Sequence, residues 1–213
     1  SAMAMVQALA FMLGIGAGNY ISRQLGSGRP EEARRFAAVS FFTAFGAGMV
    51  ILVFGNMFIS PLVRLLGATE TIAPFAEDYA RYIFFGAPFM MCSVTMNCFL
   101  RFSGLASYAM VGITTGGILN MGLDPIFIFT LNLGTAGAAI ATALSQFISF
   151  CILLAMCQLR PDALKIQLKY FRPTPRIYRQ ILLSGLPSFG RQGIASVGTI
   201  ALNHMAGPYG DAA

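Results

Sequence analysis

Charged residues are scarce in this sequence of 213 residues, since Asp, Glu, Lys and Arg together make up only 10% of it. Average soluble domains carry roughly a quarter of charged residues. Here 56% of the residues are hydrophobic, and a soluble core of this length cannot use so much apolar surface. The scarcity of charge therefore excludes an ordinary soluble domain and indicates a membrane protein.

Acids and histidine are too few for common catalytic sites. The chain has eight Asp and Glu residues and one histidine, His204, which we interpret as a polar interface residue. An intramembrane aspartyl protease needs two buried acids, and a serine protease needs a base beside its nucleophile. No phosphate-binding loop is present, so ATP is not expected to drive this chain directly. We expect a protein that is not an enzyme and needs no cofactor.

Cysteine is also rare, and all four cysteines lie in apolar runs: Cys92, Cys98, Cys151 and Cys157. Their spacings match neither a metal site nor a redox pair, and bilayer depth argues against disulfides. We interpret them as small apolar packing residues.

Long runs without charge dominate the sequence. Each is as long as the roughly 18 to 20 residues that a helix needs to cross a bilayer, or longer. The sequence therefore predicts an all-α fold, a polytopic transmembrane helical bundle. The expected spans are 2–22, 38–62, 79–100, 106–130, 135–158 and 180–206.

Twelve of the fourteen Lys and Arg residues lie between these spans, and the fourteen form no continuous basic face, which argues against a nucleic-acid partner. Most of them lie in loops 23–35, 101–105 and 160–179. Short loops rich in Lys and Arg stay in the cytoplasm. We therefore expect an integral membrane protein, in a bacterial inner (plasma) membrane, with these three loops inside the cell.

Small residues and prolines recur within the spans. Small residues four positions apart share a helix face and let two helices approach closely; the pairs are Gly14 with Gly18, Gly112 with Gly116, and Gly134 with Ala138. Neighbouring helices can satisfy the carbonyls that a proline frees, so we expect kinks at four positions: Pro61, Pro88, Pro125 and Pro187.

Asp124 is the acid that lies inside a predicted span, where a carboxylate is costly and marks an ion or proton site by default. Asn120 lies four residues earlier, on the same helix face. If the span ends near Thr130 and the next begins near Gly134, Asp124 and Thr142 lie at similar depths, about 9 Å and 12 Å. The three groups can share one proton or coordinate one small cation such as Na⁺. The alternative is a structural brace for a helix end that proline weakens.

Arg191 is the second unusual charge, deep inside a predicted span and about 18 Å from its inner end if the span starts near Arg179. It can line a substrate path or pair with an acid on another helix. The structural alternative, a snorkelling side chain or an interior pair, is equally open.

The first span starts without a preceding polar segment, and the last ends directly at "AGPYGDAA". We therefore expect the chain to be a fragment of a longer protein. Three blocks carry a resemblance that runs through nearly the whole chain: "FMLGIGAGNYISRQLGSGRPEEARR", "RFSGLASYAMVGITTGGILNMGLDPIFIFTLNLGTAGAAIATALSQ", and "SGLPSF" with "GPYGDAA". The sequence resembles the multidrug and toxic compound extrusion (MATE) family of secondary transporters, in its prokaryotic form.

The resemblance implies two lobes of six helices each. Residues 1–159 would hold about helices 2 to 6 of the first lobe, 160–179 a basic cytoplasmic linker, and 180–213 the start of the second lobe, with about helix 7. In many prokaryotic members a first-lobe cation site combines an acid on the first helix with residues that match Asn120, Asp124 and Thr142. No acid lies between residues 180 and 210, which favours this site over a seventh-helix acid found in some branches.

The function that the resemblance implies is antiport by alternating access, with organic cations exported in exchange for H⁺ or Na⁺. Ion binding at Asp124 would change the helix bend around Pro125. Phe and Met side chains suit a cavity for cationic amphiphiles. The expected partners are small organic cations and the lipid bilayer, with no obligate protein partner.

Two other functions fit the sequence less well. A flippase for a lipid-linked precursor would need several basic residues in its cavity to hold a diphosphate, and Arg191 is the single candidate within the spans. A passive channel would need a filter-like loop or a ring of charge, and the sequence has neither.

Overall fold

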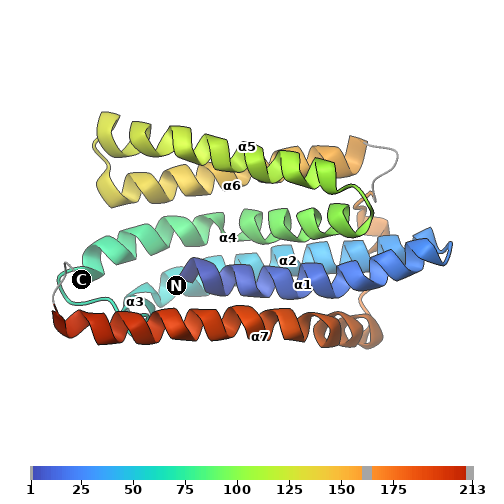
Figure 1. Ribbon diagram of the computed structural model, residues 1–213, viewed down its shortest axis with the longest axis horizontal. Coiled ribbons are helices and arrows are strands. Elements are labelled where there is room, and N and C mark those ends of the chain that lie inside the picture. Colours follow the sequence, from blue (N-terminus) through green and yellow to red (C-terminus); the bar gives the residue numbers. More distant parts are fainter. Residues whose placement is uncertain (1, 160–164, 210–213) are drawn as a thin grey trace.

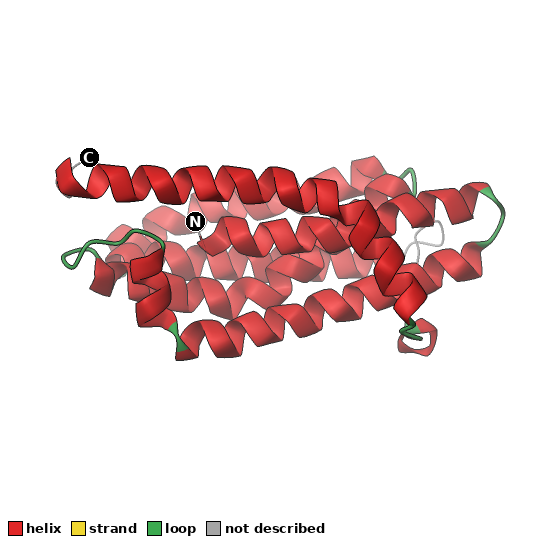
Figure 2. Ribbon diagram, turned by 90° about the horizontal axis from the view of Figure 1, so that it is seen from below, coloured by secondary structure: helices red, strands yellow, loops and turns green. Residues whose placement is uncertain are grey.

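The computed structural model describes residues 2–159 and 165–209 of the chain. Every regular element in these residues is a helix (Figure 2), which confirms the all-α prediction. The elements are α1 (Ala2–Gly26), α2 (Pro30–Met57), α3 (Ile59–Leu65), α4 (Ala73–Phe102), α5 (Ala106–Pro125), the π-helical turn η1 (Ile126–Thr130), α6 (Gly134–Leu159), the 3₁₀ turn η2 (Leu168–Tyr170), α7 (Pro175–Ala206) and the 3₁₀ turn η3 (Gly207–Tyr209).

The long helices run side by side, with α4 in the middle of the bundle (Figure 1). Helix α4 packs against α1, α2, α5 and α6, while α7 lies along α1. In the most apolar stretch of α4, 83% of the residues are buried, whereas in that of α5 with η1 only 6% are. Helix α4 therefore forms the centre of the bundle and α5 its edge.

Five described helices are long and apolar enough to cross a membrane: α1, α2, α4, α5 with η1, and α6. This finding agrees with five of the six predicted spans. The predicted span 180–206 forms most of α7 but is not among the five. Polar residues such as Arg191 and Gln192 lower the hydropathy of α7.

The connections between the long helices lie at two ends of the bundle (Figure 1). The turns between α1 and α2 and between α4 and α5 lie at the right-hand end, where α6 ends and α7 begins. The turns that join α3 to α4 and α5 to α6 lie at the opposite end. The basic loops predicted from the sequence therefore share one end of the molecule.

Helices α2 and α7 begin earlier than the predicted spans, because their first turns carry helix-starting residues rather than apolar ones. Helix α2 has Pro30 in its first turn, followed by Glu31 and Glu32. Proline costs nothing where no intrahelical N–H bond is needed, and acids favour the positive end of a helix. Helix α7 begins at Pro175, after Thr174 accepts a hydrogen bond from the backbone N–H of Ile177.

The predicted span 38–62 is divided between two helices near Pro61, one of the four prolines at which we expect kinks. Helix α2 ends at Met57, and α3 begins at Ile59 after Phe58, which has φ −112°. Pro61 has no N–H to donate to the carbonyl four residues earlier, that of Met57. The helix therefore breaks just before the proline. Helix α4 and helix α7, by contrast, continue through Pro88 and Pro187.

Two of the three predicted small-residue pairs lie at close helix contacts. Gly14 and Gly18 of α1 face α4, and Gly112 and Gly116 of α5 face α6. A Cβ atom placed on Gly14 would lie only 2.9 Å from the Sγ atom of Cys98. These contacts confirm the predicted role of the two pairs in packing.

The third pair does not have the predicted packing role. Gly134 has open space around it and adopts φ +59°, so it serves the turn that starts α6. A left-handed backbone costs a glycine little. The four cysteines are free, and three of them, Cys92, Cys98 and Cys157, are buried between helices, as packing residues should be.

A close backbone contact joins α1 and α7. A Cβ atom on Gly16 would overlap the carbonyl of Ile181, and one on Gly185 would overlap the carbonyl of Met12. Glycine at both positions lets the two helices touch through their backbones. The sequence pattern predicted neither glycine as part of a helix contact.

The end of α7 is hydrogen-bonded to the end of α3. Asn203 donates through Nδ2 to the carbonyl of Leu66 (3.3 Å), and His204 donates through Nε2 to the carbonyl of Leu65 (3.1 Å). The last carbonyls of a helix lack partners within it, so α7 supplies donors that α3 needs. His204 is an interface residue, as the sequence predicts.

Candidate functional site

The candidate cation site lies where the end of α5 meets the beginning of α6. Asn120 and Asp124 are one helical turn apart on α5, and Thr142 lies in the early part of α6. Asn120 donates through Nδ2 to Asp124 Oδ1 (3.4 Å) and to Thr142 Oγ1 (3.2 Å). The structure thus brings together the three residues that the sequence singles out.

The hydrogen bonds leave oxygen atoms available at this site. Thr142 donates its own hydroxyl proton to the carbonyl of Ala138 (2.9 Å), so its oxygen is oriented to accept from Asn120. Asp124 is partly buried, and its Oδ2 atom accepts no hydrogen bond from a described residue. Oδ2 is therefore an oxygen atom of this site that can take a proton or contribute to cation coordination.

The site suits a proton or a hard monovalent cation better than a transition metal. Its donors are a carboxylate, a hydroxyl and an amide, and hard cations take oxygen ligands. No group of three His, Cys, Asp or Glu side chains able to hold a metal ion occurs within residues 2–159 and 165–209.

Pro125 explains why α5 changes its geometry directly after Asp124. A proline cannot donate to the carbonyl four residues earlier, and the chain continues as the π-helical turn η1. In this turn Leu131 donates its backbone N–H to the carbonyl of Ile126 (3.1 Å). A Cβ atom on Gly137 would lie 2.6 Å from the carbonyl oxygen of Phe127, so η1 packs closely on α6. Asp124 therefore lies at a helix irregularity of a kind that is frequent at functional sites.

A cavity of about 330 Å³ opens beside this site, between α1, α4, α5 and α6. Asn120 and Thr142 line the cavity, and Asp124 does not. The remaining lining residues are uncharged polar, glycine or apolar, with Arg101 as the charged exception. They are Met3, Gln7, Phe11, Ser93, Val94, Asn97, Arg101, Ile113, Gly116, Gly117, Ser145, Gln146, Ser149 and Leu153.

Two α4 residues in this lining are deeply buried. Ser93 is 4% exposed, and its Oγ atom has no hydrogen-bond partner among the described residues. Asn97, 5% exposed, donates through Nδ2 to the backbone carbonyl of Ala109 (2.9 Å). A buried hydroxyl without a partner is costly. The cavity wall therefore contains unused hydrogen-bonding capacity.

Six uncharged polar residues of this cavity were not predicted from the sequence: Gln7, Ser93, Asn97, Ser145, Gln146 and Ser149. Charge and hydropathy do not single out such residues, because each is one amide or hydroxyl in a long apolar run. A signal is nevertheless present in the spacing. Ser93 and Asn97 are four residues apart on α4, and so are Thr142 and Gln146 on α6, so each pair shares a helix face.

Arg191 is an exposed residue of α7 and does not line the cavity beside the cation site. It forms no ion pair or hydrogen bond with a residue that the structure describes. Its role in a substrate path stays a prediction.

Comparison with known proteins gives consistent results. A family model described as MatE matches residues 1–126. The multidrug export protein MepA of Staphylococcus saprophyticus is 29% identical over 208 residues, which cover 98% of this chain and 46% of that protein. The chain therefore spans about half the length of the curated relatives that it matches.

Solved structures match as well. An inward-facing multidrug resistance MATE family transporter of the MOP superfamily is 34% identical, with a TM-score of 0.89 over 96% of this chain and 46% of that one. An outward-facing MATE structure, also 34% identical, gives a TM-score of 0.81 over 89% of this chain and 42% of that one.

Proposed function

The chain belongs to the MatE family, and from this premise we propose that a two-lobed transporter containing it exports small organic cations in exchange for H⁺ or Na⁺. The observation that carries the proposal is the Asn120 bridge, 3.4 Å from Asp124 Oδ1 and 3.2 Å from Thr142 Oγ1, at the edge of a polar cavity. The names of its relatives, multidrug export proteins, support a transporter rather than an enzyme.

The coupling proposal rests on charge. An ionised Asp124 attracts either the coupling ion or a cationic substrate to the neighbouring cavity. Binding of H⁺ or Na⁺ at Oδ2 neutralises the carboxylate and removes this attraction. The coupling ion and the cationic substrate thus compete for the same negative charge, so that binding of one lowers the affinity for the other. Such mutual exclusion is the requirement for antiport.

A change of helix geometry would accompany this exchange. Pro125 and η1 follow Asp124 directly. Because Pro125 has no N–H, it makes no hydrogen bond to the preceding turn of α5. We propose that ion binding biases the bend at this point and that the lobes exchange inward and outward openings. The cavity and the ion site would then both open first to one side of the membrane and then to the other.

The lobe assignment follows the same family premise. We assign residues 1–159 to the first lobe, 160–179 to a linker and 180–213 to the start of the second lobe. The higher TM-score with the inward-facing relative supports an inward-facing arrangement here, with the second-lobe helix α7 packed on α1. We place loops 23–35, 101–105 and 160–179 in the cytoplasm and the protein in a bacterial inner membrane.

The flippase alternative has less support. Binding a lipid-linked diphosphate calls for several basic groups in the cavity, and Arg101 is the basic residue among those that line it. A cavity with mostly amides, hydroxyls and apolar groups suits an organic cation better.

The test is transport by the full two-lobed protein in lipid vesicles loaded with a fluorescent cationic dye. Proton, sodium and no-gradient conditions are compared in the same preparation. Efflux that depends on one of the two gradients supports antiport and identifies the ion. Efflux that is equal without a gradient contradicts antiport, and movement of a lipid-linked diphosphate without dye efflux supports the flippase.

A further inference from the structure

The segment of residues 165–174, which leads into α7, is attached to the first half of α2. The ring of Phe171 lies against the ring of Phe42 in an edge-to-face contact, with 5.4 Å between their centroids. Ile166 is only 5% exposed. Arg35 donates through both Nε and Nη2 to the carbonyl of Arg172, each at 3.4 Å. The segment is therefore a packed part of the bundle, and its side chains have defined positions relative to α2.

This attachment gathers four basic residues, which we call the basic cluster: Arg34, Arg35, Lys169 and Arg172. Two of them converge on the ring of Tyr170, with the Arg34 guanidinium carbon 5.9 Å and the Lys169 nitrogen 5.1 Å from its centroid. Arg34 also donates through Nη1 to the hydroxyl of Tyr170 (3.4 Å). That hydroxyl keeps its own proton for another acceptor.

The positive charge of the basic cluster is not neutralised within the described chain. Glu31 and Glu32 lie nearby in the first turn of α2, exposed, yet neither forms an ion pair with a described residue. Residues 165–179 hold five Lys and Arg, of which two belong to the basic cluster, and no acid. Like charges held together repel one another. The cluster therefore offers a favourable place for an anion.

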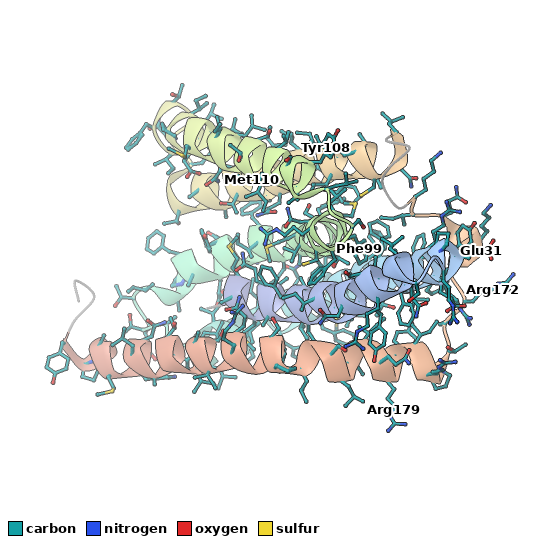
Figure 3. The ribbon with its side chains drawn as sticks, turned by 45° about the vertical axis from the view of Figure 1, so that its right-hand side comes forward. Glu31, Phe99, Tyr108, Met110, Arg172 and Arg179 are labelled. Carbon is teal, nitrogen blue, oxygen red and sulfur yellow. The ribbon has the colours of Figure 1, made fainter. Side chains whose placement is uncertain are left out.

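The position of the cluster relates this anion to the bilayer. It lies at the end of the bundle where α2 begins, and Figure 3 shows Glu31 and Arg172 together at that end. Leu168, beside Lys169 in sequence, is 69% exposed. A basic group next to an exposed apolar side chain at a helix end fits the boundary between headgroups and acyl chains.

We propose that the basic cluster binds the phosphate headgroup of an anionic phospholipid. The guanidinium of Arg172 and the ammonium of Lys169 supply charged donors, and the Tyr170 hydroxyl supplies a third donor. Leu168 lies beside the acyl chains of the same lipid. The site goes beyond transport itself, because it links the segment before α7 to the lipid composition of the membrane.

The experiment uses the full two-lobed transporter in a neutral detergent, with its unfolding temperature measured before and after adding phosphatidylglycerol or phosphatidylcholine. The variant K169Q/R172Q removes two charges but keeps the Arg172 carbonyl that Arg35 binds. The matched control is R176Q/R179Q, which removes two exposed charges of α7 without a described partner. Figure 3 shows the Arg179 side chain extending away from the bundle.

The proposal predicts that phosphatidylglycerol, and not phosphatidylcholine, raises the unfolding temperature of the wild type and of R176Q/R179Q. In K169Q/R172Q this rise should fall by at least half. Equal loss in both variants would overturn the proposal, because it would show a response to net charge alone. An equal rise with glycerol phosphate would also overturn it in favour of a free-anion site.

A second measurement covers the case in which the double variant does not fold. Native mass spectrometry counts phosphatidylglycerol molecules retained by the wild type and by Lys169→Gln, which changes an exposed side chain that lies over the Tyr170 ring. Fewer retained lipids in Lys169→Gln support the site, and equal numbers contradict it.

Discussion

Asn120 on α5 donates to the hydroxyl of Thr142 on α6 across 3.2 Å, and this bond joins the two helices that form the candidate cation site. The same amide nitrogen donates to Asp124. The Thr142 hydroxyl therefore fixes the position of the Asn120 amide, which in turn hydrogen-bonds the Asp124 carboxylate. A substitution at Thr142 should thus change the surroundings of Asp124, although Thr142 makes no hydrogen bond to Asp124.

Thr142→Val removes this hydroxyl while keeping the shape of the side chain. A hydrogen bond between membrane helices is worth ~1 kcal/mol, so the apparent affinity for the coupling ion should fall roughly fivefold. The measurement is dye efflux against ion concentration in vesicles. Thr142→Ser keeps the hydroxyl and should behave like the wild type, and equal affinities in all three proteins would contradict the bridging role.

Gly16→Ala and Gly185→Ala should each destabilise the contact between α1 and α7. Both added methyl groups would overlap a backbone carbonyl, which cannot move as a side chain can. Overpacking typically costs ~1 to 3 kcal/mol. The unfolding temperature of the detergent-solubilised protein should fall by several degrees.

Gly46→Ala is the control for these two variants, since Gly46 lies in α2 with no atom in reach of an added Cβ. Its unfolding temperature should match or slightly exceed that of the wild type. A similar fall in all three variants would show that the close backbone contact is not the cause.

Phe171→Ala should loosen the segment before α7. The loss of the edge-to-face contact with Phe42 removes ~1 kcal/mol, which makes local opening roughly fivefold more frequent. Hydrogen exchange of residues 165–174, measured by mass spectrometry, should rise accordingly. Phe54→Ala changes an exposed ring on α2 and serves as control. Unchanged exchange in Phe171→Ala would mean that this ring does not fix the segment.

The double substitution of Asn203 and His204 by Ala should free the end of α3. Two donors to the Leu65 and Leu66 carbonyls are lost, at ~1 kcal/mol each. Hydrogen exchange in residues 66–72 should therefore rise more than tenfold. Thr199→Ala, which loses only a bond to Ala195 within α7, should leave it unchanged. Equal exchange in both variants would contradict the interhelical role.

The sequence predicts the helices well because the physics that selects them is local. Length, hydropathy and the placement of Lys and Arg locate five spans and a group of basic loops. Hydropathy misses helix starts such as Pro30 and does not by itself show the break before Pro61, which the proline indicates, since proline and first-turn acids act through backbone geometry rather than hydropathy.

The grouping of Asn120, Asp124 and Thr142 at the candidate cation site is predictable for a related reason. A lone acid in an apolar span is conspicuous, and the four-residue spacing of Asn120 and Asp124 fixes their common face. Thr142 follows from equal depth on the next helix. The cavity beside them is not predictable in this way, because it needs the pairing of α1 with α4, and no local pattern in Gln7 or Ser93 states that pairing.

The central claim is that Asp124 couples ion binding to export. Its most direct test is gradient-driven dye efflux from vesicles holding the full transporter with Asp124→Asn, compared with Asp78→Asn, which makes the same change at an exposed acid of α4. The account predicts that Asp124→Asn abolishes gradient-driven efflux in a folded, inserted protein while Asp78→Asn preserves it. Unchanged efflux in Asp124→Asn would contradict the account and leave Asp124 as a brace for the end of α5.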